Sequence, residues 1–109
     1  MSELSQKKCK PCEGGVEPFQ ESKIHDMLKK LDKWEYKEGK ICKRYTFKNH
    51  YETMAFVNAL AWISHREDHH PDLEVGYSWC HVSYMTHAIK GISENDFICA
   101  AKIDALFQL

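Results

Sequence analysis

Histidines are the residues of this sequence with the clearest capacity for chemistry. The chain holds seven of them in 109 residues, and five fall within one stretch of 23 residues. Histidine is the side chain that can both donate and accept a proton near neutral pH. Imidazoles placed at a helix end, a loop and a strand end could therefore line one pocket and share proton transfers. The clustered histidines are His65, His69, His70, His81 and His87.

Three interpretations of the cluster compete. A metal site is disfavoured because the side chains of the adjacent His69 and His70 diverge, and neither an H-E-x-x-H pair nor a Cys/His finger spacing is present. Capping or packing roles suit any single histidine, and we assign them to His25, His50 and His81. Metal-free general acid–base catalysis is the interpretation that uses the cluster as a whole. Neither a G-x-S-x-G nucleophile motif nor a glycine-rich phosphate loop offers another chemistry.

Three helices and two strand pairs are expected to position these histidines. Apolar residues recur at helical spacing in three segments, and alternate in two others. The second strand pair should bend near Gly76 or Ser78, and Ser93 to Asp96 resembles a helix-capping box with Asp in place of Glu or Gln. The expected helices cover 20–33, 49–66 and 97–106, and the expected strand pairs cover 34–47 and 74–86.

Two of these elements carry specific packing expectations. In the second strand pair, Cys80, Val82 and Tyr84 should share one face. The 49–66 helix has an apolar stripe around Phe56 and Leu60, and a second stripe on another side. A helix that is apolar on two sides should be more buried than a surface helix. The second stripe comprises Tyr51, Met54, Ala55 and Trp62.

The element order α-β-β-α-β-β-α predicts an α+β fold. Separated hairpins of this kind usually merge into one four-stranded antiparallel sheet, with the helices packed on one face. The strand order does not follow from the sequence. We expect residues 1–18 to form an N-terminal arm and residues 19–109 to form a single domain.

Composition excludes several classes of partner. With 15 basic and 16 acidic residues, the net charge of −1 gives no field to attract nucleic acid or an anionic membrane. No apolar stretch approaches the roughly 20 residues needed to cross a bilayer, and no signal peptide opens the chain, so a cytoplasmic location is expected. The five cysteines form no disulfide framework. The C-x-x-C pair Cys9 and Cys12 lacks further zinc ligands nearby and is interpreted as part of the arm.

The spacing of the histidines resembles the signature of the pterin-4a-carbinolamine dehydratase family. The matching pattern has seven anchors over 32 residues. Similarity extends to the arm from Cys9 to Gly15, to Trp34, to 56–58 and to 91–96. His65 and Ala88 depart from the pattern, because many relatives carry an acidic residue at each position. The anchors are His65-x3-His69-His70-Pro71-x5-Tyr77-x9-His87-x8-Asp96.

The resemblance implies a lyase that removes water from 4a-hydroxytetrahydrobiopterin, or a related pterin, to give the quinonoid dihydropterin. It implies catalysis by His69, His70 and His87. Of these, His70 or His87 is expected to act as the acid, and His69 as a base or pterin-orienting group. It also implies no metal and no separate cofactor, because the pterin is the substrate. Substrate-binding or supporting roles are expected for His65, Pro71, Tyr77 and Asp96.

The partners implied by the resemblance are an identical chain, in a homodimer or homotetramer, and functionally an aromatic amino-acid hydroxylase whose spent pterin is recycled. Two alternatives stay open. The chain could be a protein-binding module of the same fold, similar to animal relatives that act as dimerisation partners of a transcription factor, with Trp62 and Phe56 as candidate contacts. It could also act on another pterin.

Overall fold

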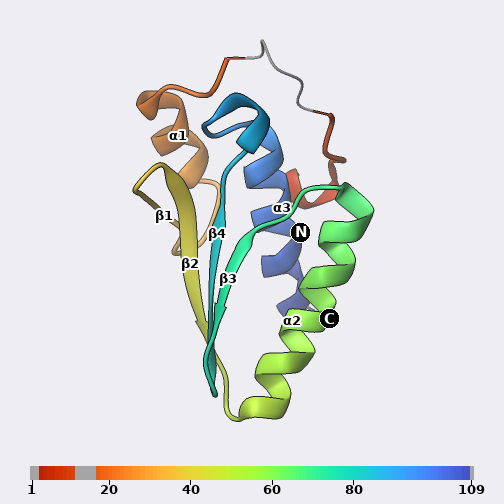
Figure 1. Ribbon diagram of the computed structural model, residues 1–109. Helices are drawn as coiled ribbons and strands as arrows, with labels where there is room; N and C mark the ends of the chain where they lie inside the picture. Colours follow the sequence, from red (N-terminus) through yellow and green to blue (C-terminus); the bar gives the residue numbers. More distant parts are fainter. Residues whose placement is uncertain (1–2, 12–16, 109) are drawn as a thin grey trace.

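A four-stranded sheet with helices on one face forms the body of the molecule (Figure 1). The computed structural model describes residues 3–11 and 17–108. Cys12 therefore lies outside the described residues, as do Gly14 and Gly15 of the arm motif. The predicted α+β class and element order are confirmed. The elements are η1 Leu4–Gln6, α1 Glu21–Leu28, β1 Glu35–Lys37, β2 Lys40–Thr46, α2 His50–Glu67, β3 Asp72–Val75, β4 Trp79–Tyr84, η2 His87–Ile89, α3 Glu94–Ala105 and η3 Leu106–Gln108.

The strand order is β1-β2-β4-β3, and every neighbouring pair is antiparallel. The two hairpins therefore join through β2 and β4, whose register places Tyr45 opposite Cys80. Glu38 and Gly39 connect β1 to β2, and both have positive φ angles, of 52° and 79°. Two such residues suit the tight turns that favour glycine in hairpins. Gly76 begins the turn after β3, where an added Cβ would lie 2.1 Å from the Trp79 indole.

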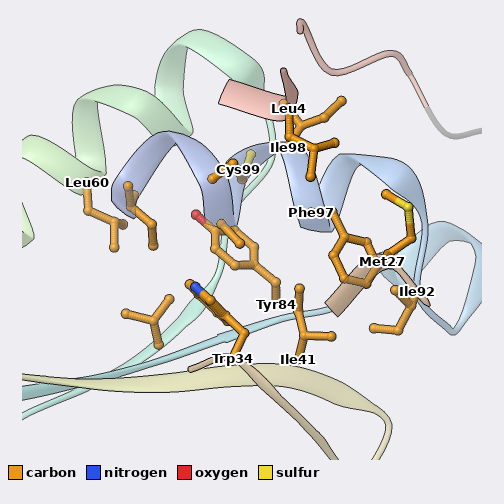
Figure 2. Close-up of a cluster of buried hydrophobic side chains, with 14 of the residues drawn as sticks. Leu4, Met27, Trp34, Ile41, Leu60, Tyr84, Ile92, Phe97, Ile98 and Cys99 are labelled. Carbon is orange, nitrogen blue, oxygen red and sulfur yellow. The ribbon is translucent and has the colours of Figure 1, made fainter. Parts of the chain in front are cut away.

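The core lies between the inner face of the sheet and α3. Cys80, Val82 and Tyr84 share that inner face and are fully buried, as their alternation predicted. Figure 2 shows the Tyr84 ring pointing from the sheet toward α3, among Trp34, Ile41 and Phe97. Eight of the twelve residues of α3 are buried, including Asn95 and Asp96 in its first turn. This burial places the start of α3 close to the end of β4.

The helix α2 matches its predicted range within one residue at each end. The prediction that both of its apolar stripes are buried is wrong for a single chain. Asn49 caps it by accepting a hydrogen bond from the Glu52 backbone at 2.9 Å. Its first stripe packs into the core, and Phe56 is only 6% exposed. The second stripe faces outward, with Tyr51 82% and Trp62 60% exposed. Local periodicity identifies both stripes but not how many neighbours cover the helix.

The first helix is shorter than its periodicity indicated. It ends at Leu28, and the following turns lead to Lys33, which has a φ of 64°. This reversal delivers Trp34 into the core, where its indole Nε1 donates to Asp104 Oδ2 at 3.0 Å. A long-range contact therefore overrides the helical pattern of 29–33. The third helix begins earlier than predicted, at Glu94, because the predicted capping box of Ser93 and Asp96 is formed.

Asp104 joins three elements through one carboxylate. Besides the indole of Trp34, it accepts hydrogen bonds from the Lys43 ammonium at 2.9 Å and from the Tyr45 hydroxyl. Burial, followed by this contact with Asp104, raises the pKa of Tyr45 well above its usual range. The Tyr45 hydroxyl therefore stays protonated at neutral pH. The cluster ties β2 and the segment before β1 to the end of α3. No helix among the described residues is long and apolar enough to cross a membrane.

We predict that Asp104→Ala lowers the free energy of unfolding by about 2–3 kcal/mol, because it leaves three donors without their shared acceptor. Urea denaturation followed by tryptophan fluorescence measures the change. Asp26→Ala is the matched control, since its pair with Lys29 is exposed at 3.8 Å and should change stability by less than about 0.5 kcal/mol. Equal effects of the two substitutions would contradict the structural role of Asp104.

Candidate active site

The three predicted catalytic histidines line one open cleft of about 550 Å³. The cleft lies where the end of α2, the start of β3, the end of β4 and the start of α3 meet. Asp68 caps the C-terminal end of α2 in a left-handed conformation (φ 50°), and its successor His69 donates its backbone N–H to Ser64 O at 3.2 Å. This reversal turns the chain from α2 toward β3, so that His69 and His70 enter the cleft. His87 enters it from η2, just beyond β4.

His69 is held on two sides. Its Nε2 lies 2.6 Å from Asp96 Oδ1, and its ring stacks on Tyr84 with centroids 5.7 Å apart and an interplanar angle of 6°. Its side chain is only 12% exposed. An ionised carboxylate is solely an acceptor, so Nε2 carries a proton and donates it to Asp96. In neutral His69 the lone pair then lies on Nδ1, the nitrogen suited to accepting a proton.

Asp96 is the buried centre of this network. The residue is 0% exposed, and its Oδ2 accepts hydrogen bonds from the Ser93 backbone at 2.9 Å and from Thr86 Oγ1 at 2.8 Å. Thr86 gives its single hydroxyl proton to Asp96, so the Ser93 hydroxyl, 2.7 Å away, donates to Thr86. The carboxylate also lies in the first turn of α3, where the helix dipole favours negative charge. These contacts offset the cost of burying a charge.

His70 and His87 occupy a different environment, because both are exposed on the cleft wall. Exposed imidazoles can exchange protons with solvent, which suits groups that must be reprotonated in each cycle. Asp72 lies at the start of β3. Its hydrogen bond from Lys40, at 2.9 Å, and the Lys40 charge lower its pKa, and the charge of His87 adds a smaller effect in the same direction. An ionised carboxylate therefore lies within the electrostatic reach of His87.

The remaining predicted site residues lie at varying distances from the cleft. Asp96 does not line the cleft but is hydrogen-bonded to His69, which does. Pro71 follows His70 immediately before β3. His65 does not line the cleft; it is exposed on α2 and packs against Trp62, with ring centroids 5.7 Å apart. Tyr77 lies in the β3–β4 turn, at the other end of the sheet (Figure 1). Its carbonyl accepts from Thr53 Oγ1 at 2.9 Å, so its position fits a turn-shaping role.

The histidines given structural roles lie outside the cleft. His25 is on α1, and His50 opens α2 and stacks on Tyr77 with centroids 5.3 Å apart. His81 is on the outer face of β4, between Arg44 and Glu74. Across the described ranges, 3–11 and 17–108, no group of three or more metal-binding side chains is placed to hold an ion.

Several lining residues were not identified from the sequence. Part of the cleft wall comes from the N-terminal arm, which lies more than 50 positions before the cleft histidines in the chain. The C-x-x-C pair and the similarity of Cys9 to Gly15 to the family's arm marked this segment, but neither indicated a contact with the site. Thr86 and Asn95 flank His87 and Asp96, but threonine and asparagine carry no signal of their own in a loop. The lining residues missed are Cys9, Lys10, Pro11, Arg66, Glu67, Asp68, Met85, Thr86, Ala88 and Asn95.

Comparison with known proteins supplies an independent line of evidence. The family model described as pterin 4 alpha carbinolamine dehydratase matches residues 17–106. A protein of Nitrosomonas europaea with the provisional name pterin-4-alpha-carbinolamine dehydratase is 61% identical over 107 residues, which cover 97% of this chain and 95% of that protein.

Two solved structures are also similar. A transcriptional coactivator/pterin dehydratase from Brucella melitensis has a TM-score of 0.78 and 28% identity, over 82% of this chain and 97% of that one. A pterin dehydratase-like protein identified as a RuBisCO assembly factor in the α-carboxysome has a TM-score of 0.57 and 27% identity, over 67% of this chain and 84% of that one. Proteins of this fold therefore carry names from more than one functional class.

We predict that Asp96→Ala lowers the free energy of unfolding by about 3 kcal/mol, because it removes a helix cap and leaves the buried Thr86 and Ser93 donors without their acceptor. Chemical denaturation measures the loss. Asp96→Asn is the matched comparison, because its amide oxygen can still accept from Ser93 and Thr86, and it should cost roughly half as much. A loss below about 0.5 kcal/mol in the alanine variant would contradict the role of Asp96 as the centre of the network.

Proposed function

Because this chain belongs to the pterin 4 alpha carbinolamine dehydratase family, we propose that it removes water from a 4a-hydroxytetrahydropterin by histidine general acid–base catalysis. The observation that carries the proposal is the meeting of His69, His70 and His87 in one cleft, although His70 and His87 are 17 positions apart in the chain. We further propose 4a-hydroxytetrahydrobiopterin as the natural substrate, and the quinonoid dihydropterin and water as the products.

The chemistry matches the available groups. As the C4a–O bond breaks, the N5 lone pair forms the C4a=N5 double bond and the N5 proton is lost. Hydroxide is a poor leaving group, so an imidazolium must donate a proton to it, while a neutral imidazole accepts the proton from N5. Each such transfer commonly contributes about 10²–10⁴ in rate. The reaction is redox-neutral, and so the proposed mechanism uses neither a metal nor a separate cofactor.

The environments of the histidines support different roles. His69 donates Nε2–H to the buried Asp96, so its Nδ1 lone pair is available to accept a proton or to orient the pterin. We therefore assign His69 as the base or orienting group. We assign the acid to His70 or His87, whose exposure allows reprotonation from solvent. Asp96 is then a positioning residue, which acts through the tautomer and orientation of His69.

The proposed reaction implies a cellular context. Its substrate arises when an aromatic amino-acid hydroxylase uses its tetrahydropterin, so we propose that this chain recycles that cofactor in the cytoplasm. A separate reductase would then restore the tetrahydropterin. Another 4a-hydroxypterin could use the same machinery, because the transferred protons belong to C4a–OH and N5, which such pterins share.

A second candidate function is protein binding through α2. The observation that favours it is the exposed stripe of Tyr51, Met54 and Trp62, together with the coactivator and assembly-factor names of the two structural neighbours. Phe56, proposed earlier as a contact, is buried in the core, so its predicted role as a contact is wrong. Large exposed apolar side chains on one helix are typical of interfaces. We propose that a second copy of this chain covers the stripe, in a homodimer or homotetramer.

The enzymatic proposal predicts that His69→Ala, His70→Ala and His87→Ala each lower turnover at least about 100-fold while the fold survives. Ultraviolet absorbance follows decay of the 4a-carbinolamine, generated in situ by an aromatic amino-acid hydroxylase. His25→Ala is the matched control, because His25 lies on α1 outside the cleft, and it should retain full activity. Intact activity in all three cleft variants, or no acceleration by the folded parent protein, would overturn the proposal.

The binding proposal predicts that Trp62→Lys shifts the protein to a lower oligomeric state, because a charge cannot be buried unpaired in an apolar interface. Size-exclusion chromatography with light scattering measures the mass. Lys29→Ala on α1 is the surface control, and it should leave the mass unchanged. A monomeric parent protein would contradict the proposed self-association, and would leave the exposed stripe to a foreign partner.

A further inference from the structure

The N-terminal arm is docked along α3 and ends in the wall of the cleft. Leu4, in η1, is buried in the core. Lys7 forms an ion pair with Glu94 at 3.0 Å, and Lys102 donates to Ser5 O at 3.0 Å. These contacts come from both ends of α3. The arm therefore follows the helix toward its N-terminal turn, which carries Asp96.

Two side chains clamp the arm where it meets the cleft. Glu67 Oε1 accepts the Cys9 backbone N–H at 2.8 Å. Asn95 binds both backbone groups of Lys10, accepting from its N–H at 3.0 Å and donating to its carbonyl at 2.6 Å. Glu67 ends α2 and Asn95 precedes Asp96, so the clamp uses the same two elements that deliver His69 and its carboxylate partner. The wall formed by Cys9, Lys10 and Pro11 therefore depends on the docking of the arm.

A pair of thiols connects this wall to the core. Cys9 Sγ lies 3.5 Å from Cys99 Sγ, although 90 positions separate the two residues in the chain. Cys99 is fully buried on α3, whereas Cys9 is partly exposed and lines the cleft. A small oxidant can therefore reach Cys9 through the cleft, and the thiol that could resolve the product is its direct neighbour.

We propose that Cys9 and Cys99 are a reversible thiol–disulfide pair whose oxidation fixes the arm covalently as a wall of the cleft. The proposal concerns a modification site, and it holds whether or not the cleft processes a pterin. In the reduced protein the described part of the arm, residues 3–11, is held by hydrogen bonds, ion pairs and packing. A bond between Cys9 and Cys99 would prevent the wall from leaving α3.

The oxidation balances with a low-molecular-weight disulfide as the oxidant. The Cys9 thiolate attacks one sulfur of that disulfide, and the first small thiolate leaves and takes up a proton. The Cys99 thiol then loses its proton and attacks the Cys9 sulfur of the mixed disulfide, and the second small thiolate leaves. Two protein thiols are oxidised by two electrons, and one small disulfide is reduced to two thiols.

The order of the two steps follows from the environments of the thiols. The hydrogen bond with Cys9 and burial both raise the pKa of Cys99, so Cys99 is the poorer first nucleophile. The mixed disulfide on Cys9 removes that hydrogen bond, and places the Cys9 sulfur beside Cys99. The remaining described cysteines, Cys42 and Cys80, lie in the sheet.

The test oxidises the full chain with oxidised glutathione and maps disulfides by mass spectrometry of unreduced peptides. We expect a Cys9–Cys99 linkage that dithiothreitol reverses. Cys12→Ser should form the same linkage, whereas Cys99→Ser should not. Cys9→Ser should not form the linkage either. Because Cys9 is partly exposed, this variant is less prone to misfold than Cys99→Ser, whose substituted residue is fully buried. A Cys9–Cys12 linkage in the parent protein, or a mixed disulfide that never resolves, would overturn the pair.

The effect on the arm has its own readout. Hydrogen exchange of the Cys9 and Lys10 amides, which the clamp protects, should slow at least about 10-fold on oxidation. The thermal midpoint should rise by at least about 5 °C, because the bond closes a long loop. Cys12→Ser should show both changes and Cys9→Ser neither. A linkage that forms without slowing exchange at these two amides would contradict the proposed fixing of the wall.

Discussion

The buried carboxylate of Asp96 is the interaction on which the rest of the site depends. An ionised group with no solvent contact persists only where donors surround it. Those donors come from Ser93 before α3, Thr86 after β4 and His69 after α2. Three chain segments must therefore meet at one point. Because His87 directly follows Thr86, the contacts that stabilise the charge also place His69 and His87 on the same cleft.

The core and the cleft share residues, so their energetics are linked. Tyr84 fills the centre of the core with its ring, and that ring also supports His69 by stacking. Burial raises the pKa of Tyr84 far above its usual range, so its hydroxyl stays protonated at neutral pH. The base or orienting group proposed for the reaction is thus supported by a rigid neutral surface on one side and by a fixed carboxylate on another. Preorganisation of this kind limits the reorganisation needed during proton transfer.

The two exposed histidines and the arm form the adaptable part of the site. His70 and His87 lie on the wall of an open cleft, and the arm contributes a segment of that wall through side-chain clamps rather than a strand or helix. Elements held by a few hydrogen bonds open more readily than a packed core. The proposed site therefore combines a firmly held His69 with a wall that depends on the docking of the arm.

The sequence by itself determined the features that depend on local spacing. The alternation that buries Cys80, Val82 and Tyr84 and the capping box at Ser93 depend on neighbours within a few positions. The family pattern of the histidines spans 32 residues, but it too can be read from spacing along the chain alone. Only the tertiary structure decided the strand order, the truncation of α1 before Trp34, the outward stripe of α2 and the docking of Cys9 beside Cys99. Each of these depends on contacts between residues dozens of positions apart. The local spacing of apolar and polar residues does not specify which of those long-range contacts form.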